Sequence, residues 1–206
     1  MFLSLDGIDG VGKSIQVELL ADCLRSKGRD VVTCRDPGST KLGEEVRAVL
    51  LGHHDTPLGM CSEMLLYMAA RAQLVEEVIR PALEAGQTVV CDRFLLANVV
   101  YQGYGGGLDV DELWTVGRVA TGGLQPDLTL LLDMPPEDAL ARLPGEADRM
   151  EQRGVSFMTK VRDGFLAEAA KHPAAISVID AAGGIEEVQQ RIQSAVGKLV
   201  QRDGLV

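Results

Sequence analysis

Short runs of apolar residues recur five times along the chain. In Val89-Val90-Cys91 and Leu130-Leu131-Leu132 the apolar residues are consecutive rather than alternate, which is typical of parallel strands buried on both faces. The pattern predicts strands over Phe2–Asp6, Asp30–Cys34, Thr88–Asp92, Leu128–Asp133 and Ile176–Asp180.

Longer segments with the spacing of amphipathic helices separate these runs. Alternation of strand and helix indicates an α/β protein, so we expect a three-layer fold in which helices flank a five-stranded parallel sheet. Pro81 interrupts the third helical segment, so a kink or break is expected there, with Gly86 ending the following turn. The helices are predicted over Lys13–Lys27, Lys41–Leu51, Ser62–Ala85, Val110–Thr121, Pro136–Leu143, Val155–Lys171 and Ile185–Val200.

Composition limits the class of protein. A length of 206 residues fits one domain over residues 1–206, and the hydrophobic fraction of 46% argues against a disordered or disulfide-stapled chain. The formal net charge of −10 opposes broad contact with nucleic acids or anionic membranes, because both would be repelled. We therefore expect neither partner, and any anionic substrate must be held by locally placed cations.

A cytoplasmic location is the expectation. The chain has four cysteines and no C-x-x-C pair, which favours buried, reduced thiols. Only Phe2–Leu5 precede the first acidic residue, which is too short for a secretory signal, and no apolar run approaches the roughly 20 residues of a membrane span.

The first predicted strand runs into a phosphate-binding loop, and a helical segment follows that loop. The residues match G-x-x-x-x-G-K-[ST], in which glycines let backbone N–H groups point at phosphate oxygens beside a helix N-terminus. Lys13 is expected to reach the β- and γ-phosphates of ATP, and Ser14 to ligate Mg²⁺. The ATP-binding residues are thus predicted to be Gly7, Ile8, Asp9, Gly10, Val11, Gly12, Lys13 and Ser14.

The loop alone defines only a superfamily of nucleotide-binding proteins. A GTPase would need an Asn-Lys-x-Asp motif to read guanine, but the single asparagine, Asn98, is followed by valine. An ATPase that drives a partner protein stays possible, although we find no partner-binding signal. The rest of the chain must therefore indicate the phosphoryl acceptor.

Five further features follow the loop in a fixed order. They are Arg35-Asp36-Pro37-Gly38-Ser39-Thr40, then Arg47, Tyr67-Met68-Ala69-Ala70-Arg71, Asp92-Arg93-Phe94 and Tyr101-Gln102-Gly103. In content and order they resemble the motifs of thymidylate kinases over nearly the whole chain. The resemblance implies transfer of the ATP γ-phosphate to dTMP, giving dTDP and ADP, with Mg²⁺ as cofactor and a homodimer as the assembly.

The chemistry of these residues agrees with a pyrimidine monophosphate acceptor. Tyr67 and Arg71 share one helical face, where a ring stacks on a base and a guanidinium donates to its carbonyl. Arg93 follows a strand end, where α/β sheets bind ligands, and Asp92 is expected to join Ser14 at the Mg²⁺. The resemblance gives Asp9 a contact with the sugar or the acceptor phosphate. The substrate-binding residues are predicted to be Asp9, Pro37, Arg47, Tyr67, Arg71, Arg93, Asn98 and Tyr101.

Two stretches, Arg35–Thr40 and Leu143–Gly154, combine glycine with charged residues and are predicted to be mobile loops that approach a ligand. The second lies where the family carries its LID. Families with glycine at the position of Gly10 take a catalytic arginine from this segment, so Arg149, with Arg142 and Arg153 at its edges, is the expected source. The predicted catalytic residues are Lys13, Asp9, Arg93 and Arg149.

Three departures from the family pattern keep other functions open. Ile15 and Ala97 replace hydroxyl residues, and the LID is short in arginine. Another P-loop nucleotide kinase, or a catalytically weakened nucleotide-binding homologue with a regulatory role, therefore stays an alternative. The expected dimer is compatible with an apolar helix face around Leu65, Leu66 and Val75.

Overall fold

A five-stranded parallel sheet forms the centre of the protein. The computed structural model describes residues 1–52, 57–143 and 153–203. The strand order is β2-β3-β1-β4-β5, and every neighbouring pair is parallel. The predicted fold class is therefore confirmed, and only the second strand is shifted, by one residue. The strands are β1 Phe2–Asp6, β2 Val31–Arg35, β3 Thr88–Asp92, β4 Leu128–Asp133 and β5 Ile176–Asp180.

Burial explains why these strands were legible in the sequence. All residues of β1 are buried, as are all but the last of β3 and β4, so apolar side chains fill both faces. At the edge of the sheet, β5 exposes Val178 and Asp180. The central strands thus carry continuous apolar runs because helices cover them from both sides.

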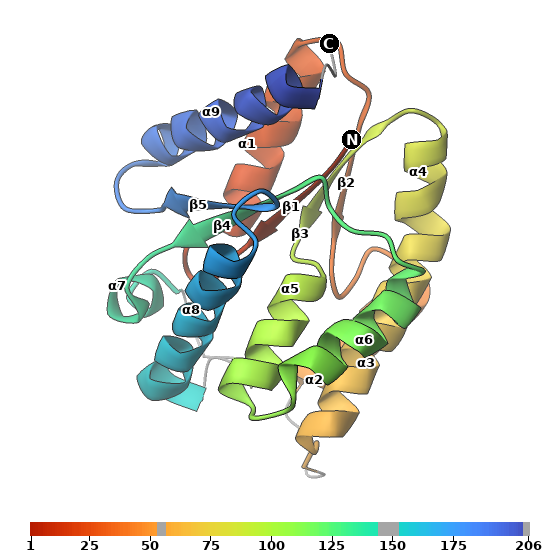
Figure 1. The fold of residues 1–206 in the computed structure, drawn as a ribbon, viewed down its shortest axis with the longest axis vertical. Coiled ribbons are helices and arrows are strands. Elements are labelled where there is room, and N and C mark those ends of the chain that lie inside the picture. Colours follow the sequence, from red (N-terminus) through yellow and green to blue (C-terminus); the bar gives the residue numbers. More distant parts are fainter. Residues whose placement is uncertain (53–56, 144–152, 204–206) are drawn as a thin grey trace.

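Helices cover both faces of this sheet (Figure 1). On one face lie α1 (Lys13–Ser26) and α9 (Ile185–Asp203), which pack on each other and on the strands. The other face carries α8 (Gly154–Lys171) and the helices between β2 and β4. Among the latter, α2 (Lys41–Leu51) and α6 (Val110–Thr121) both pack against α3 (Met60–Leu74). This three-layer arrangement is the predicted one.

The long third helix does not break at its proline, but changes to π-helical geometry before it. A π-helical turn, η1 (Val75–Ile79), joins α3 to α4 (Arg80–Glu84), and the N–H of Arg80 donates to the carbonyl of Val75. Pro81 then lies in the first turn of α4, where its missing N–H costs no helical hydrogen bond. Gly86, with a φ of +77°, follows the end of α4.

One helix was missed from the sequence. α5 (Leu95–Asn98) continues directly into a π-helical segment, η2 (Val99–Gly105). Every residue from 94 to 103 is buried, so this helix has no polar face and no amphipathic period. Residues 95–105 were therefore left unassigned between a strand and the next recognisable helix.

Several predicted boundaries were wrong by a few residues. Helix α7 (Pro136–Leu140) ends three residues early, and its continuation toward residue 143 is a turn. Helix α8 begins at Gly154, one residue early, and α9 runs three residues further than predicted. Such differences at frayed helix ends are common and leave the order of elements unchanged.

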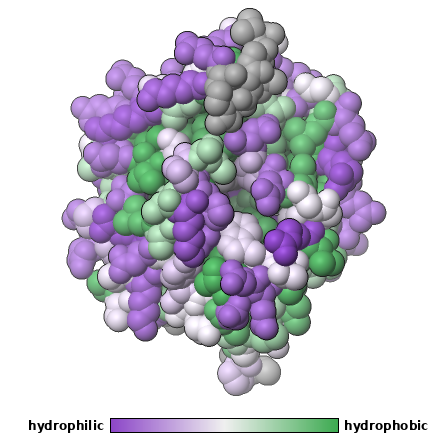
Figure 2. All heavy atoms as spheres, viewed as in Figure 1, coloured by the Kyte–Doolittle hydropathy of each residue, from purple (hydrophilic) through white to green (hydrophobic). Residues whose placement is uncertain are grey.

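The surface in Figure 2 is largely hydrophilic, as expected for a chain of net charge −10, but two other predictions were wrong. Hydrophilic residues surround smaller hydrophobic areas on the face seen in Figure 2. Of the four unpaired cysteines, Cys61 is exposed and Cys23 half-buried, so only two are buried thiols. Val75 belongs to the core and cannot form an outer apolar face. Among the described residues, no helix is both long and apolar enough to cross a membrane.

Candidate functional site

The loop between β1 and α1 is shaped by glycines that no other residue would replace easily. Gly7 and Gly10 have φ values of +139° and +84°, in the region that favours glycine. A Cβ on Gly10 would lie 1.9 Å from the carbonyl oxygen of Ala139 in α7, so the loop packs backbone to backbone there. Gly12, with φ of +92°, stands at the N-cap of α1.

The N-terminus of α1 is left available for an anion. Within the described residues, no side chain caps this helix and its first turn contains no acidic residue. By contrast, Thr40 caps α2 and Asp109 caps α6 through side-chain oxygens. Uncapped N–H groups and the positive end of the helix dipole favour a phosphate at this point.

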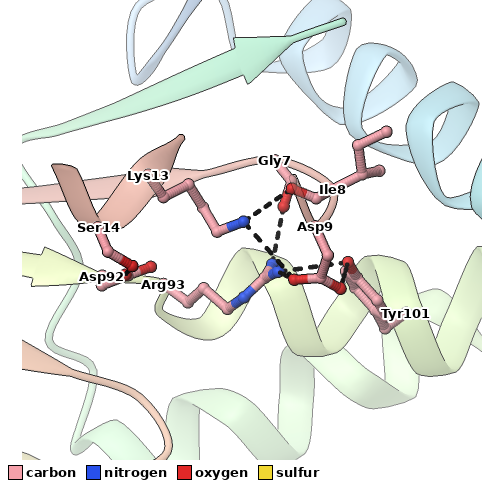
Figure 3. Close-up of polar contacts among 8 residues, drawn as sticks. All are labelled: Gly7, Ile8, Asp9, Lys13, Ser14, Asp92, Arg93 and Tyr101. Carbon is pink, nitrogen blue, oxygen red and sulfur yellow. Dashed lines mark hydrogen bonds and ion pairs between the residues drawn. The ribbon is translucent and has the colours of Figure 1, made fainter. Parts of the chain in front are cut away.

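Lys13 turns its side chain back over the loop (Figure 3). Its Nζ donates to the carbonyl of Ile8 over 2.7 Å and lies 3.8 Å from a carboxylate oxygen of Asp9. Burial, together with repulsion from the guanidinium of Arg93, lowers the pKa of Lys13 to about 8. The ammonium is therefore held where phosphates would lie, by partners that a stronger anion can replace.

Arg93, which follows β3, contacts both the loop and Tyr101 of η2 (Figure 3). Its Nη1 donates to the carbonyl of Gly7 over 2.8 Å, its Nη2 donates to Asp9, and its guanidinium lies 5.1 Å from the ring centre of Tyr101. The φ of Arg93 is +68°, a value that non-glycine residues adopt rarely and that persists where the surroundings hold it.

Asp9 is the anion on which these contacts converge. The hydroxyl of Tyr101 donates to its second oxygen over 3.0 Å. Burial alone would raise the pKa of Asp9, but the charges of Arg93 and Lys13 and the hydrogen bonds outweigh it and hold the pKa at about 2. Asp9 is thus a carboxylate at every pH at which the protein is expected to work.

Ser14 and Asp92 meet at the mouth of the loop. The hydroxyl of Ser14 donates to Asp92 over 2.7 Å, although the two residues are 78 positions apart. The described residues contain no group of three or more His, Cys, Asp or Glu side chains that would hold a metal. A cation bound here would accordingly take most of its ligands from water and phosphate.

One pocket beside the loop contains all eight residues that were predicted to bind the substrate. It is lined by these residues and by Asp36, Leu51, Ala97 and Gln102. Three arginines and two aspartates are among the lining residues, which gives this chain of net charge −10 a locally positive site. Its free volume is about 80 Å³, below the roughly 300–1,000 Å³ of typical ligand pockets.

Arg71 lies at the buried end of this pocket. Its Nε donates to Asp36 over 2.5 Å, its Nη1 to Asn98 over 2.9 Å, and its Nη2 to the carbonyl of Phe94 over 3.4 Å. The predicted contact of this guanidinium with a base carbonyl stays a prediction. Its buried partner, Asp36, was seen in a motif but was not predicted as a site residue, because the pairing of positions 36 and 71 leaves no local pattern.

The loop from Arg35 to Thr40 is better held than its sequence suggested. Asp36, Pro37 and Gly38 are buried, and the peptide bond between Asp36 and Pro37 is cis. Glu44 of α2 accepts from the Arg35 side chain over 2.8 Å and from the backbone N–H of Ser39 over 2.9 Å. These contacts hold the segment in place, in contrast to the mobile loop that was predicted.

Two predicted residues on the α2 and α3 side complete the pocket. Arg47 donates to the carbonyl of Pro37 over 3.1 Å, and Tyr67 lines the same wall from α3. Burial, with the positive charge of Arg35, lowers the pKa of Arg47. The residue therefore presents a partly desolvated cation to the pocket.

The structure describes both residues that depart from the family pattern, Ile15 and Ala97, but only the ends of the predicted LID. Ile15 is exposed on α1, and Ala97 lines the pocket. Arg149 and most of the predicted LID lie outside the described residues. Of the two flanking arginines, Arg142 is exposed, and Arg153 donates to both carboxylate oxygens of Glu63, over 2.8 and 3.1 Å.

The geometry can be set beside known proteins. The family model described as Thymidylate kinase matches residues 5–192 of the chain. The chain belongs to the thymidylate kinase family. The resemblance inferred from the spaced motifs is thereby confirmed.

Relatives within the thymidylate kinase family cover nearly the whole chain. A thymidylate kinase of Rhodopirellula baltica is 55% identical over 190 residues, which are 92% of this chain and 77% of that protein. One from an Exiguobacterium species is 45% identical over 210 residues, covering 100% of this chain and 98% of the relative. The crystal structure of thymidylate kinase from Ehrlichia chaffeensis superposes with a TM-score of 0.79 at 30% identity, covering 95% and 98% of the two chains.

Asp6 is a buried carboxylate that sequence reasoning placed only in a strand. It ends β1, one residue before the loop, and its Oδ1 has no hydrogen-bond partner among the described residues. Burial outweighs the attraction of Arg93 and Lys13 and raises the pKa of Asp6 from 3.8 to about 6. Its ionised form therefore opposes folding.

Replacement of Asp6 by asparagine tests this cost. The folded chain binds the Asp6 proton more tightly than the unfolded chain, so the penalty grows as the pH rises from about 4 to about 6 and is constant above. Relative to wild type, Asp6→Asn should gain about 2 kcal/mol in unfolding free energy between about pH 4 and about pH 7.5. Urea unfolding at both pH values measures it, with the exposed Asp22→Asn as control. An equal difference at both pH values would refute the assignment.

Proposed function

We propose that this chain transfers the γ-phosphoryl group of ATP to dTMP, giving dTDP and ADP. One observation carries the proposal: a pocket containing every predicted acceptor residue adjoins the phosphate loop in a member of the thymidylate kinase family. Asp9 and Arg93 belong to both halves of the site, so donor and acceptor would meet at these two residues.

The donor half consists of the loop and the start of α1. We assign the ATP phosphates to the glycine-shaped backbone and to Lys13, whose present contacts with Ile8 and Asp9 they would replace. Since Ile15 is exposed on α1, the hydroxyl missing there removes at most one contact to the nucleotide.

The acceptor half combines charge with a flat apolar wall. Arg47 and Arg93 present cations to a monophosphate, and the ring of Tyr67 offers a stacking surface for a pyrimidine. Arg71, with Asn98, lies at the buried end, where a base would donate and accept hydrogen bonds. A phosphate near Arg93 would compete with Asp9 for the guanidinium, and in this way the site would align the two reactants.

Mg²⁺ is part of the proposal, and Ser14 with Asp92 would hold it. A hydroxyl and a carboxylate are the hard oxygen ligands that this ion prefers, and two protein ligands leave room for phosphates and water. When bound, the ion would neutralise charge on the phosphate oxygens. A catalytic role for Arg149 stays a prediction.

We infer that residues 1–206 act as one catalytic domain in the cytoplasm, with dTMP and ATP as small-molecule partners. Nothing in the described residues favours an ATPase, another nucleotide kinase or an inactive homologue over the thymidylate kinase.

An acceptor series tests the function directly. With ATP and Mg²⁺, ADP release should depend on dTMP and should be at least tenfold slower with dCMP or dGMP, because the pocket is built for one base edge. Lys13→Met should lose about a hundredfold or more in kcat by removing the phosphate cation, and it controls for contaminating kinases. ADP release that is independent of every monophosphate would reject the proposal in favour of an ATPase.

The metal assignment predicts a shift in Mg²⁺ dependence. Asp92→Asn should raise the free Mg²⁺ concentration needed for half-maximal activity about tenfold, because a charged ligand becomes neutral. Asp133→Asn is the matched control. Asp133 also ends a strand of the sheet, but it pairs with Arg162 over 2.7 Å. An unchanged Mg²⁺ titration for Asp92→Asn would move the metal elsewhere.

A homodimer is proposed from the apolar surface of α2 and α3. Leu42 and Val49 on α2 are 42% and 40% exposed, and Leu65 on the adjacent α3 is 50% exposed. Exposed large apolar side chains on two packed helices are typical of a surface that is covered in an assembly.

Charge introduced on that surface should separate the subunits. Leu65→Lys is expected to shift the mass measured by light scattering from a dimer to a monomer, because it places an ammonium in the apolar contact. Ile185→Lys, at 46% exposure on the opposite layer, should leave the mass unchanged. A monomeric wild-type protein, or a dimer that survives Leu65→Lys, would contradict the proposed interface.

A further inference from the structure

Glu63 is a fully buried carboxylate outside the acceptor pocket. It is the fourth residue of α3 and is 0% exposed, and it is absent from the described residues that line the pocket. Burying a carboxylate is costly unless charges and hydrogen bonds compensate it. Arg153 supplies the charge through Nη2, and its guanidinium lies 4.8 Å from the ring centre of Phe157. Paired with a guanidinium, Glu63 presents only acceptor oxygens.

A row of hydrogen bonds leads from Glu63 into the pocket. Nε2 of Gln102 donates to Glu63 over 2.8 Å, and Nδ2 of Asn98 donates to Oε1 of Gln102 over 2.6 Å. Nη1 of Arg71 then donates to Oδ1 of Asn98 over 2.9 Å. We call these four residues, Glu63, Gln102, Asn98 and Arg71, the amide relay. None of them is more than 2% exposed, so water does not compete for the bonds.

The charges at the two ends fix the direction of both amides. Glu63 only accepts, so Gln102 must turn its NH₂ group toward it and its oxygen toward Asn98. Arg71 only donates, so Asn98 must turn its oxygen toward the guanidinium. If both amides were reversed, the NH₂ group of Asn98 would face the guanidinium and the oxygen of Gln102 would face the carboxylate of Glu63, so a buried donor and a buried acceptor would lose their partners.

The relay matters because three of its members line the acceptor pocket. Arg71, Asn98 and Gln102 face the space proposed for the base, and Glu63 supports them from behind. A site that reads a base needs its donors and acceptors held in one arrangement before the ligand binds. Glu63, the acceptor at the end of this row, is the one relay residue that does not line the pocket.

We propose that Glu63 is a positioning residue for the acceptor base, acting on Asn98 through Gln102. The proposal rests on the proposed function, since it assigns the pocket to a nucleotide base. Glu63 touches no substrate in this assignment. It sets which way the amides point, and through them the hydrogen-bonding pattern that Asn98 and Arg71 offer.

The competing explanation is that Glu63 only neutralises Arg153. The two explanations separate because Arg153 bonds to the same carboxylate without belonging to the row that ends at Arg71. Removing Arg153 leaves a carboxyl oxygen of Glu63 that accepts from Gln102 whether or not the group carries a proton, so the relay should stay in place. Removing the acceptor at Glu63 should release it.

Asn98 gives a direct readout because it is the single asparagine of the chain. Protein labelled with ¹⁵N at asparagine has one side-chain amide, whose chemical shift and hydrogen exchange report on its partners without any assay of activity. In Glu63→Met this amide should shift and exchange at least tenfold faster. Glu63→Gln, which keeps one acceptor oxygen, should fall between Glu63→Met and wild type, and Arg153→Gln should leave the signal in place.

Kinetics supply the second readout. Glu63→Met should raise the KM for dTMP about ten- to a hundredfold, the loss expected for a hydrogen bond to a charged group, and should change kcat less than about threefold. If Glu63→Met does not fold, as judged by thermal unfolding, Gln102→Met breaks the middle of the relay without removing a charge. The same shift and the same change in KM are then expected.

The outcomes divide cleanly. An unchanged Asn98 signal in the folded Glu63 or Gln102 variant overturns the proposal, and so does a shift in Arg153→Gln as large as that in Glu63→Met. A fall in kcat without a rise in KM also overturns it, because positioning of the base acts on binding. If the wild type does not turn over dTMP, the proposed function fails, while the Asn98 signal still decides whether Glu63 governs the relay.

Discussion

Carboxylates crowd the edge of the parallel sheet at which the strands have their carboxyl ends, and other side chains of the protein must neutralise their negative charge. Asp36 follows β2, where it pairs with Arg71, and Arg162 and Arg93 bond to other carboxylates of the same edge. Like charges at strand ends repel, and the cations that lie beside them offset this repulsion. The remaining four strands all end on aspartates: Asp6, Asp92, Asp133 and Asp180.

The sequence predicted two kinds of element correctly: helices that bury one face only, and strands that are buried on both faces. The apolar runs of β3 and β4 and the periodic helices could be read because each pattern has one common explanation. Helix 95–105 could not, since a segment buried all round has no period and its valines also suit a strand. The π-helical turn before Pro81 was foreseen as an irregularity, though not in its form.

The site was predictable to the extent that its residues lie in local motifs. All eight predicted acceptor residues line one pocket, because each motif follows a strand end or occupies a helix face that points to the same edge. What the sequence hid was pairing over distance. Asp36 with Arg71 and Glu63 with Gln102 are 35 and 39 positions apart, and neither pair leaves a spacing that a reader could recognise.

The helix formed by α5 and η2 has a further consequence for altering this protein. Residues 94–103 are buried throughout, yet they include Ala97, Asn98, Tyr101 and Gln102 of the pocket. Nearly any exchange made there to accept a different base is also an exchange in the hydrophobic core, with the usual loss of folding free energy. Evolution or design of new substrate preference in this scaffold would therefore be limited by its reserve of stability, and would best begin from a stabilised parent.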